Sequence, residues 1–418
     1  MSDHSSENSA ADQAGSRRRD FLRASAFFGA GALAAGVATP ATALVQQPEA
    51  GPQANAAKPS ATLPPVQPHG PAGVSTSVAE VYERARQALY PICRVCPQCD
   101  GVACAGEYPG LGGIFSGASF QNNYRALQRA GLKLMTIHGV SNRDKKPDTS
   151  TVIFGQKISL PALAAPIGGT GQNFRNRLPD AQYFDAIIGG AVAAGTMGAI
   201  GDGAADPMTL IQGRYDVIAR YGGRAIAGIK PRPQENFLRI VRMAEAANAF
   251  MITIDTDSAG RYQGNTRETM MEPKTVAQLR ELVRSTKIPL VVKGIMTPEE
   301  AVLVLETGAA GIAVSNHGGR VLDGGPGTAE VLPAIADKVK GKTTIFVDGC
   351  VHYGTDIIKY MALGADAVLV GRHLARAAFG GGKEGVALFL KTMRDEMEAG
   401  MVLTGSPDVR SINRKILA

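Results

Sequence analysis

Short apolar runs alternate with longer amphipathic stretches from about residue 160 to the C-terminus. The stretches between the runs include helical patterns such as ENFLRIVRMAEAAN and TPEEAVLVLETG. Strands that alternate with helices in this way form a parallel sheet. Eight repeats predict the α/β class and a closed (β/α)₈ TIM barrel. The eight runs are 161–167, 197–202, 224–230, 250–255, 289–294, 311–316, 343–349 and 367–372.

An open doubly wound sheet is the alternative fold for the same pattern. Such sheets usually have fewer strands and carry a G-x-G-x-x-G turn after the first strand. The first run here continues as APIGGTG, which lacks that frame. The barrel is therefore the predicted fold.

Polar residues end seven of the eight runs. A barrel enzyme places its chemistry at these carboxyl ends. A single polar residue there can equally be a helix N-cap, but the whole set favours a functional site. The set consists of Asp202, Lys230, Asp255, Lys293, Asn316 with His317, Asp348 and Arg372.

The turns after the last two runs, VDGC and VGRH, indicate a phosphate site. Barrels commonly bind phosphate there, and the Arg372 guanidinium could hold two phosphate oxygens. Gly349 and Gly371 permit close approach of the backbone. The alternative is that both glycines belong to ordinary strand-to-helix turns.

Composition narrows the class of protein. The 418 residues are 44% hydrophobic, which supports a globular core, and they carry a formal charge of +7 with a pI near 9.1. Scattered basic residues without interleaved aromatics do not favour nucleic-acid binding. An anionic membrane surface and an acidic small molecule are both compatible with the positive charge.

The N-terminal residues resemble an export signal rather than part of a folded domain. Arg18 and Arg19 precede an uncharged Ala/Gly-rich stretch that ends in Ala-Thr-Ala, which is the twin-arginine export pattern. We expect a signal peptide at 1–43, a disordered Pro/Ala-rich linker at 44–77, a helical cysteine-rich extension at 78–115 and the barrel at 116–418. The protein would be periplasmic or exported, and would meet a membrane only through its signal.

Four cysteines lie close together in CRVCPQCDGVAC, just before the predicted barrel. Their spacing is C-x2-C-x2-C-x4-C, and the fifth cysteine, Cys350, is distant in sequence. Such density suits a [4Fe–4S] cluster or a zinc site. In an oxidising compartment, two disulfides are the competing explanation. The candidate ligands are Cys93, Cys96, Cys99 and Cys104.

Three segments, IPLVVKGIMTPEEA, GIAVSNHGGRVLDGG and VDGCVHYGTDIIKYMALGADAVLVGR, carry a family resemblance. From about residue 115 onward, the chain resembles the FMN-dependent α-hydroxy-acid dehydrogenase/oxidase family, which includes glycolate oxidase and lactate oxidase. The resemblance implies an FMN across the barrel mouth and oxidation of a lactate-like 2-hydroxy acid to the 2-oxo acid.

The resemblance also assigns roles to single residues. His317 would be the base, paired with Asp255, and Lys293 would stabilise the reduced flavin near its N1–C2=O edge. Arg320 would bind the substrate carboxylate, with Arg261 as the family's second arginine. Tyr108 stands near the place of an N-terminal tyrosine of the family, and Gly318 with Gly319 would let flavin and substrate approach. The residues implied to contact the flavin are Ile167, Gly168, Thr253, Lys293, Ser315, Asp348, Gly349, Gly371 and Arg372.

The chain departs from the family pattern at several points. AIAGIKPRP replaces the third strand's Gln-Leu-Tyr, so Lys230 would occupy part of that space, and His352 replaces a phosphate-binding arginine. These changes leave two alternatives open, namely a larger substrate and a non-catalytic redox or sensory flavoprotein. A cluster at the cysteines would give electrons a route to a partner protein. A homo-oligomer is also compatible with the resemblance.

Overall fold

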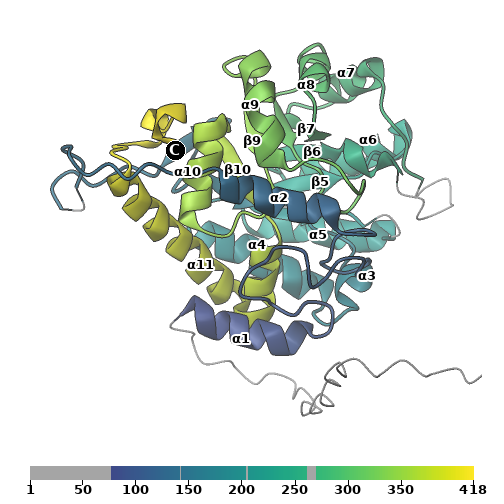
Figure 1. Ribbon diagram of the computed structural model, residues 1–418. Helices are drawn as coiled ribbons and strands as arrows, with labels where there is room; N and C mark the ends of the chain where they lie inside the picture. Colours follow the sequence, from purple (N-terminus) through teal and green to yellow (C-terminus); the bar gives the residue numbers. More distant parts are fainter. Residues whose placement is uncertain (1–76, 142, 204–205, 261–269) are drawn as a thin grey trace, which may run out of the picture. The chain divides into compact units, whose positions relative to one another are not determined.

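Eight parallel strands follow one another around the centre of the fold (Figure 1). The computed structural model describes residues 77–418 apart from 142, 204–205 and 261–269. The predicted signal peptide, and the predicted linker up to residue 76, lie outside the described residues. The strands are β3 (Ala162–Ala164), β4 (Gly198–Gly201), β5 (Ala225–Ile229), β6 (Met251–Asp255), β7 (Leu290–Ile295), β8 (Gly311–Val314), β9 (Thr344–Val347) and β10 (Ala367–Val370).

The strand order makes a nearly closed barrel. β10 pairs in parallel with β3, and every other neighbouring pair from β4 to β10 is also parallel. Between β3 and β4, the Ala164 amide donates to the Met197 carbonyl at 3.0 Å. The predicted (β/α)₈ barrel and its eight strands are therefore confirmed.

The barrel strands are buried on both faces, because helices cover the outside and side chains fill the inside. This explains why each strand reads as a continuous apolar run rather than an alternating one. Small residues let the interior close. A Cβ at Gly228, for instance, would lie only 2.3 Å from the Pro166 Cβ.

Local sequence signals fix where several helices begin. Thr275 caps α7 in a capping box with Gln278, and Thr297 caps α8, whose first residue is Pro298. The helices that follow the strands are α3 (Thr170–Phe174), α4 (Asp180–Ala193), α5 (Met208–Arg220), α6 (Gln234–Ala246), α7 (Val276–Arg284), α8 (Pro298–Leu305), α9 (Thr328–Val339), α10 (Gly354–Leu363) and α11 (Arg372–Leu403). The 3₁₀ turns are η1 (Thr256–Gly260), η2 (Val409–Ser411) and η3 (Arg414–Ile416).

The segment before the barrel packs directly on it. α1 (Val78–Leu89) lies along α11, and α2 (Ala118–Arg129) lies against α9 (Figure 1). A short antiparallel hairpin, β1 (Thr151–Ile153) and β2 (Gln156–Ile158), precedes β3. The cysteine-rich extension was expected to be helical, but its helix ends at Leu89 and the cysteines follow in irregular chain.

In the part of the chain that the structure describes, every helix is too short or too polar to cross a membrane.

Candidate active site

A pocket opens at the carboxyl ends of the barrel strands, where the polar strand ends were predicted to meet. It holds about 1030 Å³ of space free of protein atoms, open solvent included. Cofactors and substrates of barrel enzymes bind at this end of the strands. The predicted site residues that line it are Ile167, Gly168, Lys293, His317, Arg320, Asp348, Gly349, Gly371 and Arg372.

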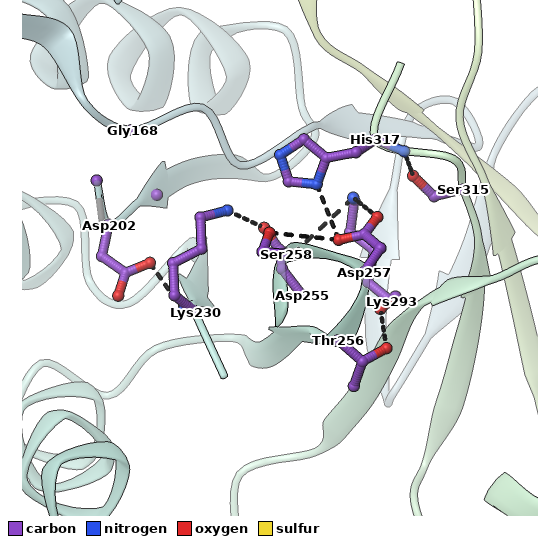
Figure 2. A network of polar contacts seen from close by, with 12 residues as sticks. Gly168, Asp202, Lys230, Asp255, Thr256, Asp257, Ser258, Lys293, Ser315 and His317 are labelled. Atoms are coloured by element: carbon purple, nitrogen blue, oxygen red, sulfur yellow. Dashed lines mark hydrogen bonds and ion pairs between the residues drawn. The ribbon is translucent and has the colours of Figure 1, made fainter. Parts of the chain in front are cut away.

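Lys293 lies at the centre of the charged groups at the pocket floor (Figure 2). Its Nζ is 3.6 Å from Asp257 Oδ2, 3.8 Å from Asp348 Oδ2 and 4.0 Å from Asp255 Oδ1. Burial alone would lower the pKa of Lys293, but the three carboxylates raise it above the ordinary value. The ammonium therefore stays charged in a buried place.

His317 is held by the turn that follows β8. Its φ of 56° is left-handed, and its amide donates to Ser315 Oγ at 3.1 Å while that hydroxyl donates to Asp348 Oδ2 at 2.7 Å. The ring nitrogen Nδ1 lies 2.9 Å from Asp257 Oδ1 (Figure 2). An imidazole held in this way by a carboxylate is suited to acid–base chemistry.

The carboxylate 2.9 Å from His317 Nδ1 belongs to Asp257, a residue to which the sequence pattern assigned no role. The predicted pairing of His317 with Asp255 stays a prediction, although the charge of His317 acts on Asp255. η1 turns the chain directly after β6, and Thr256 Oγ1 donates to the Lys293 carbonyl at 2.8 Å. Gly294 makes room for this turn, since a Cβ there would lie 2.7 Å from the Asp257 Cβ. The turn thereby brings the second aspartate of TIDTD under the imidazole.

Asp255 instead receives a hydrogen bond from Lys230 Nζ at 2.7 Å. Both side chains are buried, and strand register places Asp255 beside Lys293. Burial by itself raises the pKa of Asp255, but the charges of the two lysines and His317 reverse this and hold its pKa below the ordinary value. Asp255 is thus an ionised partner of two ammonium groups.

Arg320 reaches the pocket from the loop after β8. Its Nη2 donates to Asn173 Oδ1 at 2.7 Å, and its guanidinium lies 5.2 Å from the centre of the Tyr108 ring. Tyr108 and Asn173 also line the pocket. Arg320 and His317 thus border the same space, as a clamp and a base for one small acid would.

Gly318 and Gly319 serve the protein's own packing. Both have left-handed φ values, 64° and 74°. A Cβ would lie 2.5 Å from Arg372 Nη1 at the first and 2.3 Å from the Phe120 amide nitrogen at the second. They admit Arg372 and α2, and Gly318 also lines the pocket, so the predicted approach of flavin and substrate stays a prediction.

The turn after β9 and the start of α11 form the end of the pocket where a phosphate was predicted. The first amides of a helix lack intrahelical partners and favour an anion. Arg372 lines this end, but it stacks on Phe120 and donates to carbonyl oxygens of Leu111 and Gly318 at 2.7 and 2.8 Å. Its predicted contact with a phosphate stays a prediction.

Two residues predicted to contact the cofactor, Thr253 and Asp348, each have a buried polar atom without a hydrogen-bond partner among the described residues. These atoms are Thr253 Oγ1 and Asp348 Oδ1. A buried acceptor of this kind suits a hydroxyl-bearing ligand, and Asp348 lines the pocket. Burial raises the pKa of Asp348 above the ordinary value, although Lys293 and Ser315 oppose this. Arg261 lies outside the described residues.

The four clustered cysteines line a separate small cavity together with Arg376, and Cys99 borders both this cavity and the main pocket. All five cysteines of the chain are free thiols. Among the described residues, no three His, Cys, Asp or Glu side chains are grouped so that they could hold a metal ion. The predicted iron–sulfur or zinc site is therefore not supported.

Arg376 is the buried charged group of this cysteine cavity, which Arg94 and Asp100 also line. Its Nη2 donates to Cys99 Sγ at 3.1 Å. Burial lowers the pKa of the neighbouring His352 to about 4, with a further contribution from Arg376. This imidazole, which replaces the expected phosphate-binding arginine, is thus neutral at pH 7.

The barrel and its pocket define a class of protein: a (β/α)₈ enzyme with a buried lysine and a carboxylate-held histidine at the carboxyl ends of its strands. A family model described as FMN-dependent dehydrogenase matches residues 111–277 and 262–418. The chain belongs to this family of FMN-dependent α-hydroxy-acid oxidases and dehydrogenases. The unpaired acceptor of Asp348 and the start of α11, which both border the pocket, fit that cofactor.

Relatives by sequence carry the names of hydroxy-acid enzymes. Glycolate oxidase 1 of Zea mays is 29% identical over 339 residues, which cover 71% of this chain and 86% of that protein. 2-Hydroxyacid oxidase of Dictyostelium discoideum is 45% identical over 150 residues, which cover 36% of this chain and only 39% of that protein. L-lactate dehydrogenase of Caulobacter vibrioides is 48% identical over 132 residues, or 32% of this chain and 34% of that protein.

Solved structures agree with the fold. Mandelate oxidase with 3,3-difluoro-2-hydroxy-3-phenylpropionic acid superimposes with a TM-score of 0.65 at 28% identity, covering 82% of this chain and 98% of that chain. A mutant of mandelate oxidase with a C4a-OH-FMN adduct gives 0.63 at 26% identity, covering 80% and 97%.

Sequence reasoning assigned no role to Asp257 or Asn173. Asp257 had a visible signal, because two aspartates stand two residues apart at one strand end. Asn173 had none, since it lies in a short helix far from Arg320 in sequence.

Proposed function

We propose that the protein oxidises a small, lactate-like 2-hydroxy carboxylic acid to the 2-oxo acid with FMN as cofactor. The observation that carries this proposal is the convergence of His317, Lys293 and Arg320 on one pocket. When bound, FMN supplies the two-electron acceptor that these side chains lack. Lys293, the 349–351 backbone and the start of α11 would hold it.

His317, Asp257 and Arg320 would each have a different role in the reaction. His317 Nδ1 donates a hydrogen bond to Asp257 Oδ1. Nε2 is therefore the ring atom of His317 that would take the substrate proton. The carboxylate of Asp257 then stabilises the imidazolium that forms. The planar Arg320 guanidinium suits a bidentate contact with the substrate carboxylate.

The test is anaerobic reduction of the bound flavin. Purified protein should be yellow, and its flavin absorbance should bleach with at least one member of a panel of 2-hydroxy acids. His317→Ala should slow bleaching on the order of 10²- to 10⁴-fold while flavin content holds. His138→Ala, at an exposed histidine, is the control. Bleaching that persists at the parent rate in His317→Ala would exclude this base.

Substrate size is open to the same assay. The mandelate oxidase neighbours are named for an aromatic hydroxy acid, and the run AIAGIKPRP, which lacks the family's tyrosine, leaves a larger substrate open. The panel should therefore run from lactate to mandelate. A preference for the aromatic acid would replace the lactate-like substrate but keep the reaction.

We also propose that the protein is exported by the twin-arginine route. The support is the Arg18-Arg19 pair followed by an uncharged stretch. Replacing both arginines by lysine should leave flavin-loaded protein in the cytoplasmic fraction. Unchanged fractionation would exclude the route.

A further inference from the structure

Asp255 at the end of β6 and Asp257 in η1 lie between three positively charged or chargeable groups. Lys230 Nζ is 2.7 Å from Asp255 Oδ2, and His317 Nδ1 is 2.9 Å from Asp257 Oδ1. Lys293 lies between them, 4.0 Å from Asp255 and 3.6 Å from Asp257 (Figure 2). Each aspartate thus has one close partner of its own and shares the third.

We propose that Lys230 is a positioning residue. Its hydrogen bond holds the Asp255 carboxylate toward Lys230 and Lys293, so that Asp257 remains the partner of the catalytic histidine. This inference rests on the proposed function, because it assigns a role within that reaction. Lys230 acts through Asp255, not by taking a proton from substrate.

Burial makes the Lys230–Asp255 contact strong. Lys230 is 7% exposed and Asp255 is 2% exposed, and close opposite charges interact more strongly out of water. Removing one partner of a buried pair leaves the other charge uncompensated. Without Lys230, Asp255 would therefore have only the longer contact to Lys293 and could turn toward the imidazole.

Lys230 is itself fixed by a second pair of charges. Its amide donates to Asp202 Oδ1 at 2.8 Å, and Arg232 Nε donates to Asp202 Oδ2 at 3.0 Å. This ties the end of β5 to the chain after β4. The Lys230 side chain consequently reaches Asp255 from a rigid strand end.

Every neighbouring element presents a charge to Asp255. Asp202 faces it from the chain after β4 and Asp348 from the chain after β9, and both disfavour its ionised form. The other charged groups named above face it from β5, η1, β7 and the turn after β8. Among the positive groups that oppose these negative charges, Lys230 is the closest at 2.7 Å and contributes most to keeping the Asp255 carboxylate ionised.

The experiment compares Lys230→Met and Lys230→Arg in the FMN-loaded full chain. In Lys230→Met, the acid limb of the rate of anaerobic flavin reduction should move up by about one pH unit or more, because Asp255 takes up a proton more readily. The maximal reduction rate should fall while KM changes little. Lys230→Arg should restore most of the parent profile, and Lys391→Met, at an exposed lysine on α11, should match the parent.

A second measurement keeps the test independent of turnover. Infrared titration of the flavin-loaded protein should show a carboxylic-acid C=O band that appears at higher pH in Lys230→Met and disappears in the Lys230→Met, Asp255→Asn double variant. If no acid reduces the parent, the proposed function fails, but this band still reports on Lys230. An unmoved pH profile and an unmoved band, or a change confined to KM, would overturn the proposal.

Discussion

At the scale of the residue, the assignment of Asp257 as the partner of His317 makes a sharp prediction. Asp257→Asn removes the charge that stabilises the imidazolium, so flavin reduction should slow on the order of 10²-fold or more. Rapid anaerobic mixing with the best acid of the panel measures this rate. Asp216→Asn, on an exposed face of α5, is the matched control.

Asp255 gives a prediction for stability against pH. Its pKa is held below the ordinary value in the folded state, after burial is outweighed by the nearby positive charges. Its contribution is therefore complete above the unfolded value of about 3.9 and is lost as the pH falls through the lower folded value. Urea unfolding of the parent and Asp255→Asn should show a smaller loss of unfolding free energy in the variant across that acid range. An equal loss in both would contradict this.

At the scale of the element, two helical glycines should respond in opposite directions to the same substitution. Gly380 lies where α11 meets α1, and a Cβ there would be 1.9 Å from the Val81 carbonyl oxygen. Gly213, inside α5, has nothing within 4 Å of such a Cβ. Gly380→Ala should destabilise the protein by roughly 1–3 kcal/mol, whereas Gly213→Ala should stabilise it by about 0.5–1 kcal/mol. Thermal unfolding of both variants measures the pair, and a loss of stability in Gly213→Ala would refute the comparison.

The strands could be predicted from the sequence, whereas the turn that supplies the partner of His317 could not. The barrel was predictable because strands buried on both faces appear as continuous apolar runs, and because polar residues end almost every run. The partner of His317 was not predictable in this way. It depends on η1 and on the missing side chain of Gly294, which lies 37 positions after Asp257. Spacing likewise shows four adjacent cysteines but not the directions of their thiols.

At the scale of the whole molecule, the cysteine cavity bears on how electrons could leave the flavin site. Cys99 borders both cavities, so a metal cluster there would offer a direct outlet. The described residues group no metal-ligating set, and their thiols are free. Only if no metal binds at these cysteines would an electron acceptor, oxygen or a carrier, have to reach the proposed flavin pocket itself.

Thiol and metal analysis of the full chain tests this view. Protein purified anaerobically should contain less than stoichiometric iron, sulfide and zinc, and should titrate as 5 thiols once unfolded. The folded protein should react more slowly at neutral pH, because burial raises the pKa of Cys104 to about 11 and also raises that of Cys99, and the thiolate is the reactive form.

A stoichiometric metal that disappears in Cys99→Ser would instead mean that these thiols turn inward to bind it. Thiols lost in pairs would mean disulfides, and either result would reopen a route for electrons through this cavity.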